Sequence, residues 1–238
     1  MPYLWIIVTV VATAFQVARN ATQRGMMGEA GPWGATLVRF LFGLPFSLAI
    51  TGAAWLAAGA VHPRPSWAYA GFALSGAATQ ALATACLLVV MRRAGFAVGT
   101  LLQQSSLPMS AVIGLVLFHD HLSGRGWAGV AAATAGLVWL TWPRSGGPVE
   151  RPFSTAGLGL VIGALFGFSL NAYRHAALAL EPAHPVFAAV ATVCVAQAAQ
   201  TVTLVLYLAL RHPWALQAIF LEVLMMRAEP WKRASLPT

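Results

Sequence analysis

Seven apolar stretches, separated by short polar connections, constrain the fold of this chain more than any other feature of its sequence. They cover residues 3–19, 33–59, 67–91, 94–118, 126–142, 155–180 and 185–210. A helix of about 20 apolar residues is long enough to cross the hydrocarbon core of a bilayer. Because lipid offers no partner to backbone polar groups, each stretch is expected to be helical. The sequence therefore predicts an all-α, polytopic helical membrane protein with about seven transmembrane helices.

Composition supports a membrane environment and argues against other classes. Hydrophobic residues make up 59% of the chain, charged residues 8%, and the mean hydropathy is +0.73, more apolar than a soluble domain needs. The formal net charge of +8 is assigned to loop arginines that face anionic lipid. No basic cluster with interleaved aromatic residues precedes the tail, so nucleic acid is not an expected partner. Cys86 and Cys194 lie inside apolar runs, where a disulfide is not expected.

One short motif occurs twice. The first stretch ends in QVARNA, starting at Gln16, and 155 positions further on the sixth stretch contains NAYRHA, starting at Asn171. Both have an amide, two spacers, an arginine, a polar residue and an alanine. Repeated helical units are common in transporters. The sequence thus predicts a first five-helix repeat in residues 1–142, a linker in 143–154, and the first two helices of a second repeat in 155–210.

The end of the chain does not continue this pattern. The third helix of a second repeat would begin near Phe220, but residues 215–226 supply only about a dozen mostly apolar residues, fewer than a span needs. Lys232, the only lysine, and Pro230 follow. We therefore expect an incomplete five-plus-five inverted repeat with an atypical tail, residues 211–238. The alternative is a natural seven-helix protein with a short tail, completed by dimerisation.

Polar residues recur at helical spacing inside three of the apolar stretches. Spacings of three and four place them on one side of a helix. Either the amides only bond to neighbouring helices, or they line a polar cavity, which the three helices together favour. Pro108 is expected to bend the fourth helix, because it removes a backbone hydrogen bond. The residues are Gly76, Gln80 and Thr84; Thr100, Gln103, Ser106, Ser110 and Gly114; and Gln197, Gln200 and Thr201.

Arginines suggest the chemistry of a solute. Arg39 lies six positions beyond Trp33, about 9 Å along a helix, where it either snorkels to the headgroups or faces a pathway. Arg19 and Arg174 lie at helix ends, where anchoring is expected. Guanidinium groups pair with carboxylates and phosphates, so a small anionic solute is a candidate partner.

Other motifs point to no enzyme, metal or cofactor. Histidine and carboxylate are metal-ligand types, but His119, Asp120 and His121 are adjacent and point in different directions, so a charged interfacial loop explains them. No acid inside a span is available as a general base. Gly129, Ala133 and Gly136 form a small-residue face for close helix packing, within the chain or in a homodimer.

A family resemblance follows from three segments. Residues 31–46, GPWGATLVRFLFGLPF, resemble the second helix of EamA-like transporters in the drug/metabolite transporter superfamily, where an arginine follows the helix start. Pro108 and residues 115–136 resemble the fourth and fifth helices. Family members often have Gly-Glu after the fourth helix, so the resemblance gives Asp120 the acidic role. It also implies ten helices in two inverted repeats, a central cavity, and transport of small metabolites.

These observations predict a small-metabolite transporter of the bacterial cytoplasmic (inner) membrane, incomplete as given, with alternating access around a mid-membrane polar cavity. The alternative is a non-transporting membrane protein or the vestigial product of a disrupted transporter gene. No catalytic residue, metal or cofactor is predicted. The predicted substrate pathway consists of Gln16, Arg39, Gln80, Gln103, Gln104, Ser106, Asn171, Arg174, Gln197 and Gln200.

Overall fold

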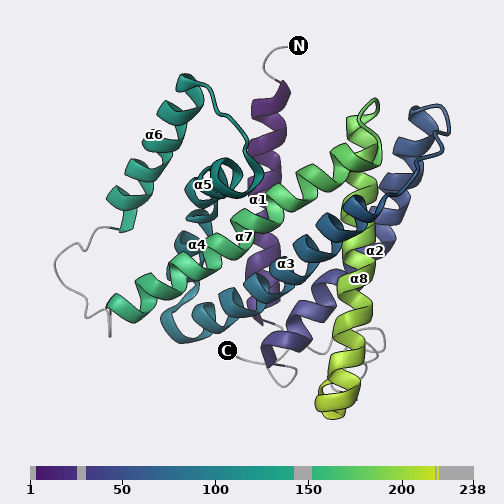
Figure 1. Cartoon of the computed structure of the whole chain (residues 1–238). Coiled ribbons are helices and arrows are strands. Elements are labelled where there is room, and N and C mark those ends of the chain that lie inside the picture. Colours follow the sequence, from purple (N-terminus) through teal and green to yellow (C-terminus); the bar gives the residue numbers. More distant parts are fainter. Residues whose placement is uncertain (1–3, 26–30, 142–151, 218, 220–238) are drawn as a thin grey trace.

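The computed structural model describes residues 4–25, 31–141, 152–217 and 219, which form helices joined by short connections, and no strand occurs in this part of the chain. Figure 1 shows the arrangement of the helices. In chain order they are α1 (Leu4–Gly25), α2 (Gly31–Ala57), α3 (Trp67–Ala94), α4 (Phe96–Gln104), α5 (Ser106–Phe118), α6 (Gly124–Thr141), α7 (Pro152–Leu180) and α8 (Pro185–Arg211).

Four of the predicted stretches are long and apolar enough to cross a membrane: α2, α3, the combined segment Phe96–Phe118, and α8. Four such helices in one chain are typical of a membrane protein. The other three predicted stretches form α1, α6 and α7. The all-α class is thus confirmed, whereas seven crossings and an inverted repeat remain predictions.

The fourth predicted helix is broken, as the proline suggested. α4 ends at Gln104 and α5 begins at Ser106. Pro108 has no N–H to donate to the carbonyl group of Gln104, four residues earlier, so the regular helix is interrupted there. The Ser105 hydroxyl donates instead to the carbonyl oxygens of Leu102, at 2.6 Å, and Gly159, at 3.0 Å. The break is therefore tied to α7.

Helix α7 crosses the middle of the assembly and contacts α3, α4, α5 and α8 (Figure 1). Gly159, Gly163 and Gly167, spaced by four, allow the close approach of the broken helix. A Cβ atom at Gly167 would lie 2.8 Å from the backbone nitrogen of Ser110. This glycine series was not among the predicted packing faces, although its spacing is visible in the sequence.

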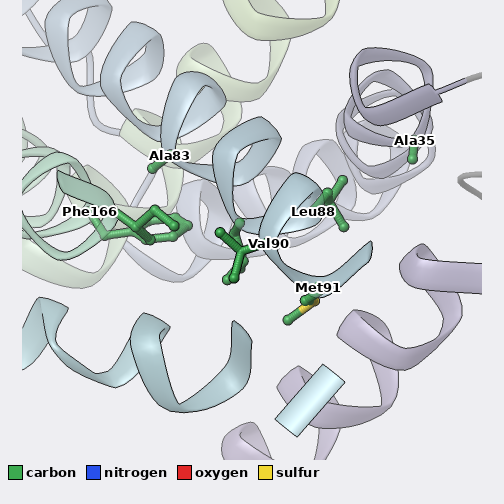
Figure 2. Packing of buried hydrophobic residues seen from close by; sticks show 8 residues of the cluster. Ala35, Ala83, Leu88, Val90, Met91 and Phe166 are labelled. Carbon is green, nitrogen blue, oxygen red and sulfur yellow. The ribbon is translucent and has the colours of Figure 1, made fainter. Parts of the chain in front are cut away.

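Apolar packing joins distant parts of the chain and also covers the outside. One buried cluster brings together Leu88 and Met91 of α3 and Phe166 of α7 (Figure 2). Large side chains such as Phe46, 72% exposed, and Trp139, 74% exposed, lie on the surface. Exposed apolar area of this extent suits contact with lipid.

Helix α6 lies at the edge of the assembly (Figure 1) and packs mainly against α5. Its residues Gly129, Ala133 and Gly136 are exposed. A Cβ atom at Gly129 or Gly136 would meet no atom within 4 Å. The prediction that this face packs tightly within the chain is therefore wrong for the described residues. Contact of this face with a second copy of the chain remains a prediction.

The predicted tail lies largely outside the described residues, and so does most of the linker. The first part of the tail is described. There, Ala215 and Ile219 are buried in a cluster with Leu37 of α2 and with Leu204 and Leu208 of α8. The chain just after α8 thus packs back onto the α2–α8 pair.

Candidate functional site

A hydrogen-bond network joins α3, α7 and α8 inside the assembly. The Tyr173 hydroxyl donates to Oε1 of Gln80 at 2.9 Å. Nε2 of Gln200 donates to the same oxygen at 3.0 Å and to the carbonyl oxygen of Ala77 at 2.9 Å. Only 2% of Gln200 is exposed. Two glutamines that the sequence placed on separate helices are thus in direct contact.

Gly76 leaves the space that Tyr173 needs to reach Gln80. A Cβ atom at Gly76 would lie 2.8 Å from Cε1 and 2.9 Å from Cδ1 of the tyrosine ring, well inside the distance of about 3.5–4.0 Å at which carbon atoms normally touch. Tyr173 was not among the predicted site residues. The signal was available, because the hydroxyl group of a buried tyrosine usually requires a hydrogen-bond partner.

Several acceptors on α8 remain unused. The Ala77 carbonyl can only accept, which places the Gln200 amide nitrogen on its side and the amide oxygen away from it. Oε1 of Gln200, Oε1 of Gln197 and Oγ1 of Thr201 are buried with no hydrogen-bond partner in the described part of the chain. An unpaired buried acceptor costs about 1–3 kcal/mol. A polar molecule that reaches these atoms would therefore gain binding energy.

A pocket of about 410 Å³ adjoins the network between α2, α3 and α8. Trp33 and Tyr207 contribute to its wall, with ring centroids 5.5 Å apart. Ala77, Ala81 and Gln200 line it as well. Mostly apolar walls with a few polar groups are characteristic of small-molecule sites.

Arg39 is directed into the assembly. Its Nη1 donates to Oγ1 of Thr84 at 3.2 Å, and Thr84 is completely buried. Its guanidinium carbon lies 5.4 Å from the centroid of the Phe40 ring. The sequence left open whether Arg39 snorkels or faces inward, and the bond to α3 shows the inward direction.

Other predicted amides bond to neighbouring helices. Nδ2 of Asn20 donates to Oε1 of Gln103 at 2.9 Å, which ties α1 to α4. Nδ2 of Asn171 donates to the carbonyl oxygens of Ser110, at 2.8 Å, and Gly167, at 2.9 Å. The bonds from Asn20 to Gln103 and from Asn171 to Ser110 correspond to the simpler interpretation, helix-to-helix bonding, whereas the bond to Gly167 lies within α7.

Asp120 forms a charged cluster at the end of α5. Its Oδ2 lies 2.6 Å from Nη1 of Arg174 and 3.4 Å from Nε2 of His175. The His175 ring stacks on Phe118, with centroids 4.6 Å apart. The left-handed backbone of His119, with φ of 55°, ends α5 and turns the chain toward α7. Asp120 therefore binds α7 directly, whereas the sequence placed it only in a loop.

The predicted pathway residues fall into separate groups. Gln80 and Gln200 share the network, and Gln197 is close to Gly43 of α2, where a Cβ atom would lie 3.3 Å from its Nε2. Gln16 and Gln104 are half-buried and Ser106 is buried, and none of the three joins the network in the described structure. The other three residues each contact a different neighbour. Gln103 contacts α1, Asn171 contacts α5, and Arg174 contacts Asp120 in the turn between α5 and α6.

No model of a protein family, no curated protein and no solved structure matches the chain.

Proposed function

We propose that the chain moves small solutes across the bacterial cytoplasmic membrane, as the EamA-like transporters that it resembles do, in the seven-helix form completed by dimerisation that is the alternative to an incomplete transporter. In this proposal it crosses the bilayer about seven times, and polar groups of α3, α7 and α8 line the route of the solute. Access alternates between the two sides of the membrane. The observation that carries the proposal is the partly buried network of Gln80, Tyr173 and Gln200 beside a pocket of about 410 Å³.

The energetic argument concerns polar atoms in a low-dielectric interior. If these side chains only held helices together, their hydrogen-bonding atoms would be expected to pair with one another, as most buried polar atoms do. Oε1 of Gln200 and Oε1 of Gln197 have no partner in the described structure. Because Gln200 lines the pocket, its unused acceptor supports a site that a polar molecule occupies part of the time.

Transport by the purified full-length chain in lipid vesicles tests the proposal. A mixture of small metabolites is offered outside, and the vesicle contents are identified by mass spectrometry. The expected result is accumulation of at least one solute, with a large loss in Tyr173→Phe, because that change removes only the hydroxyl group that binds Gln80. Tyr69→Phe is the matched control, since Tyr69 of α3 lies in a separate buried cluster with Ala176 and Leu180 and does not line this pocket. Uptake equal to that of empty vesicles for every solute would refute the proposal.

A second candidate function is that of a non-transporting membrane subunit. The uncovered face of Gly129, Ala133 and Gly136 on α6 favours it, because small residues are typical of helix-to-helix interfaces in lipid. Disulfide crosslinking between copies of Ala133→Cys would support an interface there. Crosslinking together with absence of uptake would favour this function over transport.

A further inference from the structure

The pocket beside the network includes a residue with an unused hydrogen-bond acceptor. Nε2 of Gln200 lies 2.9 Å from the carbonyl oxygen of Ala77 and 3.0 Å from Oε1 of Gln80. The Tyr173 hydroxyl oxygen is 3.3 Å from the same nitrogen, so both N–H groups of the amide are used. Oε1 of Gln200 is buried and has no hydrogen-bond partner among the described residues. Because Gln200 lines the pocket, a ligand there can satisfy this oxygen only by donating a hydrogen to it.

The described wall of the pocket carries no charged side chain. Its polar or aromatic members are Trp33, Gln200, Thr203 and Tyr207, and the others are alanines and leucines. A charged group that enters such a wall loses its hydration without gaining an opposite charge, which costs far more than burial of a neutral polar group. The pocket therefore favours an uncharged ligand over the anionic solute that the arginines of the sequence suggested.

Aromatic and small side chains give the pocket room for a ring-shaped ligand. The rings of Trp33 and Tyr207 have centroids 5.5 Å apart and planes inclined by 57°. Ala77, Ala78 and Ala81 of α3 line the pocket as well, and side chains of this size leave space beside the helix. Aromatic rings offer a large apolar contact area to another ring. The volume of about 410 Å³ lies in the range of pockets that hold small molecules.

Packing outside the pocket holds its wall in place. Leu204 lines the pocket and also belongs to the buried cluster that contains Leu37 and Leu208. Trp33 and Ala81, two further residues of the wall, pack against the same cluster. A wall that is ordered before the ligand arrives lowers the entropy lost on binding.

We propose that the pocket between α2, α3 and α8 binds an uncharged molecule that has an apolar ring system and an N–H or O–H group, and that this group donates to Oε1 of Gln200. The ring system contacts Trp33 and Tyr207. The inference deepens the proposed function and rests on it where it names the class of solute that is transported. Occupation of the pocket is measured without transport.

The test compares two probes, indole and 1-methylindole, which differ in the N–H group. Binding to the full-length chain in phosphatidylcholine nanodiscs is measured by equilibrium dialysis, and uptake of each probe by empty nanodiscs is subtracted. The expected result is saturable binding of indole and an affinity for 1-methylindole that is about tenfold lower or less, because its methyl group replaces the donated hydrogen. Equal binding of the two probes would overturn the hydrogen bond.

Gln200→Met removes the amide and keeps a side chain of similar length. Indole should lose about tenfold in affinity, whereas 1-methylindole should bind as it does to the wild type, so the ratio of the two affinities falls to about one. A purely structural role of Gln200 would change the binding of both probes equally. A ratio in Gln200→Met as large as in the wild type would show that the N–H group does not donate to Gln200.

A second pair of variants locates the probe without disturbing the network. Ala78 is exposed and lines the pocket, so the larger side chain of Ala78→Leu fills the space and should abolish indole binding. Ala209→Leu makes the same change at an exposed position of α8 that does not line the pocket, and indole binding should be unchanged. Equal indole affinities in the two variants would place the probe elsewhere and overturn the site.

Charge and lipid are tested with further measurements. Indole-3-acetate should bind about tenfold or more weakly than the uncharged indole-3-acetamide, and equal binding would overturn the preference for an uncharged ligand. Indole binding is also measured in detergent micelles. Binding that occurs in micelles and disappears in nanodiscs would assign the pocket to lipid and overturn its role as a solute site.

The outcome is separable from that of the proposed function. Indole binding that depends on Gln200, without uptake of any solute by vesicles, would refute transport and leave the pocket standing. Solute uptake that is identical in wild type, Gln200→Met and Ala78→Leu, with no saturable indole binding, would refute the pocket and leave transport standing.

Discussion

The two helices that share a sequence motif, α1 and α7, have very different surroundings. In α7, Asn171 bonds to Ser110 and Arg174 pairs with Asp120. In α1, Gln16 is half-buried outside these contacts, and Arg19 is exposed. The same pattern of amide and arginine therefore serves packing in one helix and leaves groups available in the other. The difference shows that partner positions, not the motif, decide the role of each residue.

The glycine series of α7 explains much of this difference. Gly159, Gly163 and Gly167 let α4 and α5 approach, so that Asn171 and Arg174 reach them. In α1 the residue equivalent to Gly167 by the 155-residue offset is Ala12, which is exposed. α1 consequently has only limited contact with α2 and α3.

The largest expected effect comes from filling the α7 glycine face. In Gly167→Val the new Cβ would lie 2.8 Å from the backbone nitrogen of Ser110, and backbone cannot move away as a flexible side chain can. We expect a loss of about 3 kcal/mol in the free energy of unfolding. The measurement is the midpoint of unfolding by SDS in mixed micelles.

Two controls complete that comparison. Gly157→Val places its Cβ where no atom lies within 4 Å, and Ala12→Val makes the equivalent change in α1. The free energy of unfolding of both variants should stay within about 0.5 kcal/mol of the wild-type value. A midpoint for Gly167→Val that matches these controls would show that α7 does not pack on α5 as described.

A smaller effect is expected from the repeated amides. Asn171→Leu removes the bonds to the carbonyl oxygens of Ser110 and Gly167 and should cost about 1–2 kcal/mol. Gln16→Leu in α1 should be neutral or stabilising, because it puts an apolar side chain in place of an amide outside these contacts. The same SDS titration compares the two, and equal losses would contradict the contrast between the helices.

Much of the fold could be predicted from the sequence because hydropathy and helix length are local properties. Every predicted apolar stretch is helical in the structure, and the break near Pro108 follows from its missing N–H. The observed helix ends differ from the predicted ones by a few residues. The first helix, for example, ends at Gly25, whereas the predicted stretch ended at Arg19. Helix ends depend on connections that hydropathy does not report.

The site was less predictable, because it depends on which helices meet. Spacing correctly placed Gln80 with Thr84 on one face of α3, but nothing in α3 shows that Tyr173 of α7 is the partner. The uncovered α6 glycines illustrate the same limit: small residues indicate a packing face, whereas the identity of the partner is a property of the assembled structure.

The smallest expected effect concerns the two arginines of the motif. Asp120→Asn removes the negative partner of Arg174, and Arg174 is 59% exposed, so solvent and salt weaken the pair. We expect a loss of about 0.5–1 kcal/mol at low salt, shrinking as ionic strength rises past the point where the Debye length is about 10 Å. Arg19→Gln should show no loss, because Arg19 is exposed and forms no salt bridge with the described acids. Thermal unfolding of both variants at low and high sodium chloride measures the difference. If Arg19→Gln lost as much stability as Asp120→Asn, Arg19 would have an attractive partner, and the contrast between α1 and α7 would disappear.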